Sequence, residues 1–372
     1  MLKPITLSLR LGLQRIAQQH VVIEGSGCLQ NVSAWLSAGD LLIYVGINWI
    51  KLDRHQLEPL QPEQTTPSGA CPNMAHLHAA RRRGAHVVLF DTDSLCELNS
   101  HAVTRGYVAE IWDYSHSTFQ FCAHDDARTG RPNQSHVHRH VPPGYVPPDY
   151  ARAAAANASL AARVQHLDAT AGHQRNYSGA AHVLTFIGTN AEKFGRAACL
   201  RAISQELVSR HNASLDVLSH VWSDVALART FRRRAFFLST DKYCNTGRAH
   251  DCNTLRFAPT LAEDGFVLAT ECNAEDRREW RGLVHFGSVR DHAEVFEALW
   301  RMRQQLTGPR IEFARRFAPE ELLRRAGVAA LLSELTVAAR SGGGRASGET
   351  LPWQRRTHHP GSPERLQGLA AH

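Results

Sequence analysis

Residues 232–286 constrain the fold of this chain most, because apolar runs alternate there with polar loops over a short distance. An apolar run at 234–239 leads into a polar loop that contains Lys242. Arg256 follows at the start of a helix candidate, and a second apolar run occupies 266–271. This order predicts a strand, a loop, a helix and a strand, with polar side chains gathered at the strand ends where open α/β sheets bind ligands.

The same alternation extends over most of the chain. Apolar runs at 40–46, 85–91 and 108–113 are separated by Gly-containing turns and by helix candidates, one of them at 73–83. Such spacing predicts a parallel sheet with helical connections. A second sheet begins at 182–188. The expected helices beyond it are at 191–210, 291–306 and 319–339.

A proline-rich segment separates the two sheets. Residues 141–148 read Val-Pro-Pro-Gly-Tyr-Val-Pro-Pro, which disfavours a helix and offers few backbone donors, so we expect a stiff extended crossing. The predicted division is an N-terminal acceptor-side domain (1–145), a linker or insertion (146–180), a C-terminal donor-side domain (181–338) and a disordered tail (339–372).

Composition describes a globular chain with an excess of positive charge. The 372 residues include 42 basic and 35 acidic side chains, which gives a formal net charge of +7. This balance favours a partner that carries phosphate or carboxylate. The basic runs have no interleaved aromatic stacking platform, so we expect solvated surface stripes and no nucleic-acid partner.

The cysteines and the sequons bear on the compartment. The eight cysteines form no Cys-x-x-Cys pair, so reduced, structural thiols are expected. No apolar run is long enough for a transmembrane segment, and no signal peptide is evident, which favours a cytoplasmic location. A secretory compartment is the alternative, because five Asn-x-Ser sequons occur at Asn31, Asn133, Asn157, Asn176 and Asn212.

A turn that suits an anion follows the first strand of the second sheet. Gly188 and Thr189 precede a helix whose first turns contain Lys193 and Arg196. Free backbone N–H groups and positive charge at a helix start can bind an anion. An ordinary turn between a strand and a helix explains the glycine equally well.

Four stretches of the sequence resemble a known family. They are Val-Val-Leu-Phe-Asp-Thr-Asp (87–93); Glu-Ile-Trp-Asp-Tyr-Ser (110–115) with His-Val-Pro-Pro-Gly-Tyr (140–145); Thr-Phe-Ile-Gly (185–188) with Arg196; and Asn253 to Arg256 through 267–271 to Val-His-Phe-Gly (284–287). In order and spacing the chain resembles glycosyltransferase-like proteins of the GT-B fold, related to the bacterial spore-protein and capsule group and its algal and oomycete relatives.

The resemblance implies a fold, a reaction and its partners. The fold is α/β, with two Rossmann-like domains facing across a cleft. The activity is transfer of a sugar from a nucleotide-sugar donor to an unknown acceptor, without a cofactor or a metal. The alternative is a catalytically degenerate relative that acts as a binding or scaffold protein. It arises because relatives carry Glu where this chain has Asn253, and because their Asn-His pair is replaced near Ser239.

The proposed reaction assigns roles to the polar residues. Cations and N–H groups would stabilise the leaving nucleotide diphosphate, and a carboxylate would accept from ribose or sugar hydroxyls. The expected donor-binding residues are Gly188, Thr189, Lys193, Arg196, Lys242, Arg256 and Glu271. For the arginines and Glu271 the alternative is an ordinary surface charge.

On the acceptor side, Asp93 and Asp113 stand at predicted strand ends, and His116 follows closely. Each is a candidate general base for the acceptor hydroxyl. For Asp113 a structural role is favoured, because Trp-Asp-Tyr-Ser is typical of a capped strand-to-helix turn.

Two sets of histidines and cysteines could in principle form a metal site. One would use the alternating histidines 136, 138 and 140, and the other would use His250 with Cys244, Cys252 and Cys272. Neither set has the usual short ligand spacing of zinc sites, so no metal site is expected.

Overall fold

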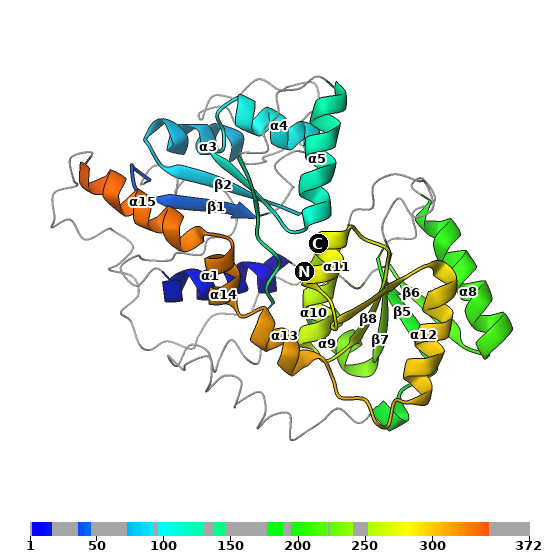
Figure 1. Ribbon diagram of the computed structural model, residues 1–372. Helices are drawn as coiled ribbons and strands as arrows, with labels where there is room; N and C mark the ends of the chain where they lie inside the picture. Colours follow the sequence, from blue (N-terminus) through cyan, green and yellow to red (C-terminus); the bar gives the residue numbers. More distant parts are fainter. Residues whose placement is uncertain are drawn as a thin grey trace, which may run out of the picture.

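We describe the fold from a computed structural model of the chain. The residues that it describes are 2–16, 36–45, 73–92, 96–129, 137–145, 177–188, 195–219, 221, 224–240 and 252–341. They form two α/β units, each built on its own parallel sheet (Figure 1).

The first unit contains a four-stranded sheet in the order β1-β2-β3-β4, with every pair parallel. Its strands are β1 (Leu41–Val45), β2 (His86–Asp91), β3 (Glu110–Asp113) and β4 (His138–His140). Its helices are α1 (Leu2–Ile16), α3 (Asn73–Arg82), α4 (Cys96–Thr104) and α5 (His116–Thr129). The continuous apolar run of β2 is buried along nearly its whole length, as expected for a parallel strand covered on both faces.

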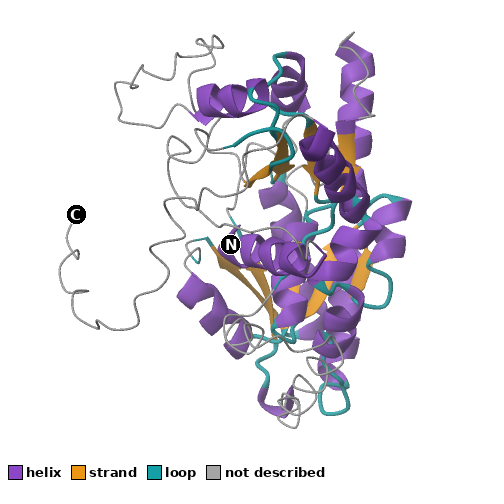
Figure 2. Cartoon of the chain, turned by 90° about the vertical axis from the view of Figure 1, so that its left-hand side faces the viewer, coloured by secondary structure: helices purple, strands orange, loops and turns teal. Residues whose placement is uncertain are grey.

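The second unit contains a five-stranded parallel sheet in the order β6-β5-β7-β8-β9. Its strands are β5 (Val183–Ile187), β6 (Ser214–Leu218), β7 (Phe236–Ser239), β8 (Phe266–Thr270) and β9 (Val284–Gly287). Its helices are the short η3 (Tyr177–Gly179) and η5 (Thr254–Arg256), with α8 (Arg196–His211), α9 (Asp224–Arg233), α10 (Phe257–Ala262), α11 (Ala274–Glu279) and α12 (Val289–Arg301). Figure 2 shows helices packed around both sheets.

The last described helices run from the second unit back to the first. They are α13 (Arg310–Arg316), α14 (Pro319–Arg325) and α15 (Val328–Ser341). Phe313 belongs to the core of the second unit, whereas Leu323, Val328 and Leu332 pack with Trp112 in the core of the first. In Figure 1, α14 lies next to α1, and α15 lies beside the first sheet. Helix α14 thus contributes to both cores, with Leu322 in the second, and α15 completes the first core although it follows the second sheet in the chain.

The α/β class with two Rossmann-like parallel sheets is confirmed. The predicted strands at 40–46, 85–91, 108–113 and 266–271 correspond to β1, β2, β3 and β8. The helix expected at 319–339 is two helices, α14 and α15, because the chain turns at Gly327, whose φ of 74° suits glycine. Residues 151–176 lie between the two sheets in the sequence, and they are outside the described residues.

The expectation of reduced thiols is wrong. Cys96 is bonded to Cys122, and Cys252 is bonded to Cys272, with Cα–Cα distances of 4.9 and 5.3 Å. No described cysteine is free. The two cysteines of each pair are 26 and 20 residues apart in sequence, so no short motif indicates the bonds. Only the packing of the elements brings their Cα atoms together.

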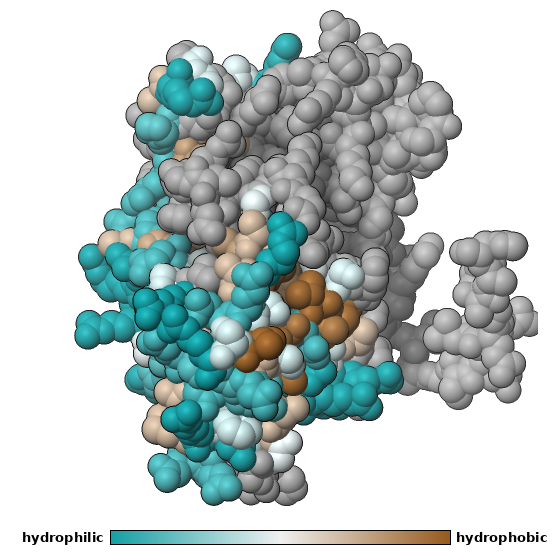
Figure 3. Space-filling model, turned by 90° about the vertical axis from the view of Figure 1, so that its right-hand side faces the viewer, coloured by the Kyte–Doolittle hydropathy of each residue, from teal (hydrophilic) through white to brown (hydrophobic). Residues whose placement is uncertain are grey.

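Few large apolar side chains of the described residues are exposed. Figure 3 shows the side of α8 and α12, where the coloured part of the surface is largely hydrophilic apart from one compact hydrophobic area. Among the described residues, the exposed large apolar side chains are those of Val208, Val217, Met302 and Val337. Within the part of the chain that the structure describes, no helix combines the length and the apolar character needed to cross a membrane.

Candidate functional site

Arg256 lies where the two units meet. It ends η5, whose other residues are held by the first unit: the Thr254 hydroxyl donates a 2.7 Å hydrogen bond to the Tyr114 carbonyl. Leu255 is buried in the core of the first unit with Trp112. The backbone before Arg256 is thus fixed from one unit, while the helix after it, α10, belongs to the other.

Arg256 and Arg196 share one aromatic ring. Their guanidinium carbons lie 5.2 and 5.6 Å from the centroid of the Phe186 ring on β5. Burial, and then the charge of Arg196, lower the pKa of Arg256 to about 9, and Tyr114 opposes this shift. The two guanidiniums therefore repel each other, and a bound anion would relieve this repulsion.

The Arg256 guanidinium presents a buried donor. Its Nη1 atom is inaccessible to solvent and has no hydrogen-bond partner among the described residues. The same atom lies close to Gly188, where an added Cβ would come within 2.9 Å of it. Because Gly188 has no side chain, the Arg256 guanidinium can occupy the space beside the end of this strand. A buried N–H without a partner costs stability unless a ligand supplies the acceptor.

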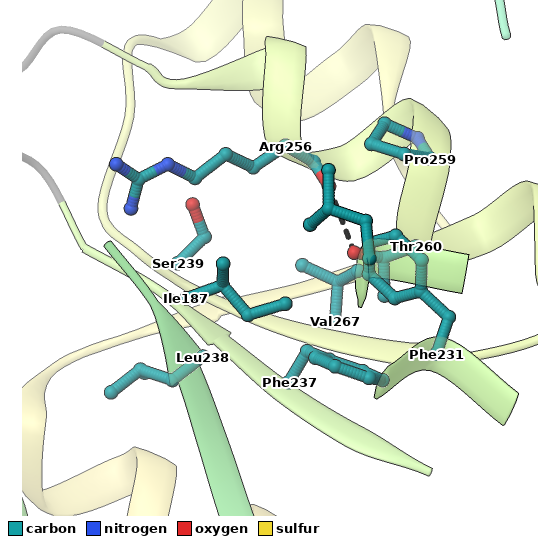
Figure 4. A pocket seen from close by; sticks show the side chains of 10 residues that line it. Ile187, Phe231, Phe237, Leu238, Ser239, Arg256, Pro259, Thr260 and Val267 are labelled. Atoms are coloured by element: carbon teal, nitrogen blue, oxygen red, sulfur yellow. Dashed lines mark hydrogen bonds between the residues drawn. The ribbon is translucent and has the colours of Figure 1, made fainter. Parts of the chain in front are cut away.

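A pocket opens beside this arginine in the second unit. In Figure 4 the Ser239 hydroxyl lies on the same side as the Arg256 guanidinium, and aromatic and aliphatic side chains fill the other end. The Thr260 hydroxyl donates to the Arg256 carbonyl at 2.9 Å and stabilises the first turn of α10. The apolar side chains that line the pocket are those of Ile187, Leu227, Phe231, Phe237, Leu238, Pro259 and Val267.

The structure brings some predicted donor-binding residues together and not others. Gly188, Arg196 and Arg256 lie around Phe186. Glu271 follows β8 with a side chain 51% exposed, and it accepts a 2.9 Å hydrogen bond from Arg277. The remaining predicted donor-binding residues lie outside the described residues: Thr189, Lys193 and Lys242.

The acceptor-side candidates have different surroundings. Asp113 is fully buried, and its Oδ2 lies 2.7 Å from Nδ1 of His138, as expected for a structural carboxylate. His116 begins α5, and its ring stacks on the ring of His140 with centroids 3.6 Å apart. Asp93 lies outside the described residues.

The sequence analysis missed Asp276, a buried carboxylate that joins the units. Its Oδ1 accepts from the His116 backbone N–H at 2.9 Å, and its Oδ2 accepts from the N–H and hydroxyl of Ser117. Burial raises the pKa of Asp276, and these hydrogen bonds oppose the shift. A carboxylate at the start of α5 is favoured by the helix dipole. The Asn-x-x-Asp pattern at 273–276 indicates a helix start, but it does not indicate a contact with another domain.

A second missed residue, Glu279, lies near two histidines of the first unit. Its Oε2 is 3.4 Å from Nε2 of His140. The ligand atoms of His116, His140 and Glu279 all lie within 4.8 Å of one another. The two metal sets weighed from composition are not formed by described residues: His138 contacts Asp113, Cys252 and Cys272 are bonded to each other, and His136, Cys244 and His250 lie outside the described residues.

Comparisons with known proteins give structural neighbours alone. No family model and no curated protein matches the sequence. Solved structures that resemble the chain include an α,α-trehalose 6-phosphate synthase from Burkholderia multivorans, with a TM-score of 0.43 and 12% identity over 90% of this chain and 77% of that one. A UDP-forming α,α-trehalose-phosphate synthase from Burkholderia vietnamiensis gives 0.40 and 11% over 92% and 80%.

A glycosyltransferase from Rickettsia africae also matches, with a TM-score of 0.40 and 11% identity over 89% of this chain and 81% of that one. All of these TM-scores are below 0.5, so the matches carry no argument about the activity of this chain. We therefore base the function on the contacts of its own residues.

Proposed function

We propose that the protein is a glycosyltransferase of the GT-B type, which transfers a sugar from a nucleotide-sugar donor to an unknown acceptor. The observation that carries the proposal is the buried Nη1 of Arg256, which lacks a hydrogen-bond partner among the described residues and lies where the two units meet. A diphosphate oxygen is an acceptor of the charge and size that this donor requires.

The two guanidinium groups that lie over the Phe186 ring suit a leaving group that gains negative charge during the reaction. When the bond between sugar and diphosphate breaks, negative charge builds on the diphosphate. Arg256 and Arg196 would stabilise that charge directly, so the transfer step requires no metal. Gly188 leaves the room that the Arg256 guanidinium occupies in this group.

The other predicted residues keep narrower roles in this proposal. Thr189, Lys193 and Lys242 follow the strands β5 and β7 in sequence, and they would add donors to the diphosphate. Glu271 follows β8 and would accept from a ribose or sugar hydroxyl once Arg277 releases it. Asp93 is the proposed base for the acceptor hydroxyl, while Asp113 orients His138.

The alternative is a degenerate relative that binds a nucleotide or an anion without transferring a sugar. Asn253 favours this alternative, because the resemblance leads us to expect a glutamate there to bind sugar or ribose hydroxyls. Binding and turnover separate the two functions, since only a transferase releases nucleotide diphosphate from a donor in the presence of an acceptor.

Thermal shift tests the donor site first, because a ligand that binds only the folded state raises the melting temperature. The protein is heated with pyrophosphate, UDP, GDP, ADP and CMP and with common sugar conjugates. We expect a shift with pyrophosphate and a larger one with a single nucleoside diphosphate. Arg256→Met should reduce the affinity at least tenfold, about 1.4 kcal/mol.

The matched control is Arg229→Met, which removes an exposed arginine from α9, a helix that lines the same pocket. Its nucleotide shift should equal that of the unchanged protein. A shift that survives Arg256→Met would overturn the assignment of the donor site. Binding to nucleic acid that falls steeply with salt, without any response to nucleoside diphosphates, would favour a basic nucleic-acid binder instead.

A further inference from the structure

The contact between α5 and α11 holds a group of side chains that the proposed transfer does not use. His116 begins α5, His140 ends β4, and Glu279 ends α11. Two of them therefore come from the first unit and one from the second. Polar bonds surround the group, since Asp276 binds the start of α5, and the Asn273 amide donates to Gln120 at 3.0 Å.

The three side chains lie close together. The ligand atoms of the three residues lie within 4.8 Å of one another. The imidazoles of His116 and His140 stack with their planes 25° apart. An imidazole nitrogen binds a metal in the plane of its ring, so one of the two rings must turn about its side-chain bonds before both nitrogens face one ion. Zinc is bound at about 2.0–2.2 Å by imidazole nitrogen and carboxylate oxygen, which places two ligand atoms roughly 3–4 Å apart.

Two of the ligand atoms are buried and lack partners. His140 Nε2 and Glu279 Oε2 are inaccessible to solvent and make no hydrogen bond with any described residue, although they lie 3.4 Å apart. Burial without hydrogen bonds is costly for both atoms. A cation between them would satisfy both at once. A proton shared between them is the competing explanation, and it predicts no affinity for metal.

The types of ligand atom select the class of ion. The group offers two imidazoles, from His116 and His140, and one carboxylate, from Glu279. Calcium and magnesium depend on several oxygen ligands, whereas two imidazoles and one carboxylate suit zinc.

We propose that His116, His140 and Glu279 bind a divalent transition-metal ion of the zinc type, which joins the two units at the contact between α5 and α11. Asp276 is a positioning residue, because its carboxylate fixes the backbone of His116 and Ser117. The fourth coordination position would be taken by water. The ion holds the two units together and takes no part in sugar transfer.

Metal titration of the full chain tests this proposal. The protein is stripped with EDTA, exchanged into chelator-free buffer, and titrated with Zn²⁺ against a chromophoric chelator. We expect one ion per chain and a higher melting temperature when the ion is bound. His116→Gln, His140→Gln and Glu279→Gln should each weaken zinc binding at least tenfold. Co²⁺ in place of Zn²⁺ should give the visible absorption of a four-coordinate site.

The control variant is His124→Gln, which removes an exposed histidine from the same helix as His116 and should leave zinc affinity unchanged. Three separate variants keep the test decisive if one of them fails to fold. Absence of binding at one ion per chain would overturn the proposal. Equal affinity in His140→Gln, Glu279→Gln and the unchanged protein would do so as well.

Discussion

At the scale of single residues, the structure separates charges that are compensated from charges that are not. Glu110 receives hydrogen bonds from Arg139 at 2.6 and 3.2 Å and from the Trp112 indole at 2.7 Å. Arg256 has no comparable partner among the described residues for its Nη1. The first arrangement stabilises the native state, and the second leaves a donor for a ligand.

Glu110 should make the free energy of unfolding depend on pH in the acidic range. Burial alone would raise its pKa, but the nearby His86 imidazole and the hydrogen bonds from Arg139 and Trp112 outweigh this and lower the pKa from 4.5 to about 2. A carboxylate whose pKa is lower in the folded state stabilises it fully above pH 4.5 and progressively less as the pH falls towards 2. We expect Glu110→Gln to cost up to about 3 kcal/mol at pH 7 and much less near pH 2.

Urea unfolding of the unchanged protein and of Glu110→Gln between pH 7 and pH 2.5 measures this difference. Glu334→Gln on α15 serves as control, because its side chain is exposed and its effect should not vary with pH in this way. A gap between Glu110→Gln and the unchanged protein that stays constant down to pH 2.5 would contradict the role of these hydrogen bonds.

Residue identity predicted part of the candidate site. Arg196, Arg256 and Gly188 were expected from a strand, a turn and a helix start, because the carboxyl ends of parallel strands meet at one edge of a sheet. Phe186 was not singled out, since an aromatic residue within an apolar strand looks the same whether it packs in the core or also supports two cations. Asp276 and Glu279 were missed because their partners are about 140–160 residues away in sequence.

At the scale of elements, the sequence predicts strands with continuous apolar runs best. β2 and β8 were predicted nearly in full, since each is buried along most of its length. β6 was missed because it is an edge strand in which no residue is fully buried, and its sequence Ser-Leu-Asp-Val-Leu contains polar residues. α11 was missed because it has six residues, of which five are charged, so no apolar stripe marks it.

The disulfide next to η5 should couple stability to anion binding. Cys252 lies two residues before the start of η5 and is bonded to Cys272 just after β8. A crosslink over 20 residues contributes roughly 3 kcal/mol, largely by restricting the unfolded chain. We expect the double variant Cys252→Ala with Cys272→Ala to lose about this much free energy of unfolding and to bind pyrophosphate more weakly, because Arg256 is held less firmly.

The other disulfide provides the matched comparison. Cys96 and Cys122 close a loop of similar length between α4 and α5, away from η5. Replacing both with alanine should lower stability by a comparable amount without changing the affinity for pyrophosphate. Equal losses of affinity in the two double variants would mean that η5 is not positioned by its disulfide.

At the scale of the whole molecule, the described residues connect the two units through η5, through the contact between α5 and α11, and through the return of α14 and α15. Each buries side chains of one unit against the other. The sequence alone divides the chain into consecutive domains, because patterns along the chain carry no information about which core a late helix enters. The boundary of the donor-side domain at residue 338 therefore stays a prediction, while α15 packs in the first core.

Removal of α15 should unfold the first unit selectively. A chain that ends at residue 326 lacks Val328, Leu331 and Leu332, which are all buried against the first sheet. Loss of this cover costs about 1.5–3 kcal/mol for each side chain. We expect amide exchange to increase in β1, β2 and β3 while β5, β7 and β8 keep their protection.

Mass spectrometry of exchanged peptides gives this readout strand by strand. A chain that ends at residue 341 is the control, because it keeps α15 and removes only the remaining tail. Unchanged exchange in β1 to β3 after the shorter truncation would show that the first core does not depend on α15.

The position of α15 in the first core also delays the folding of the first unit during synthesis. The strands of the first sheet leave the ribosome well before the helix that covers them, since Val141 and Leu332 pack in the same core. At about 5–20 residues per second, the delay between them is roughly 10 to 40 s. During this interval the nascent sheet exposes apolar surface to chaperones and to other chains. The unit that is made first is therefore the last to be completed.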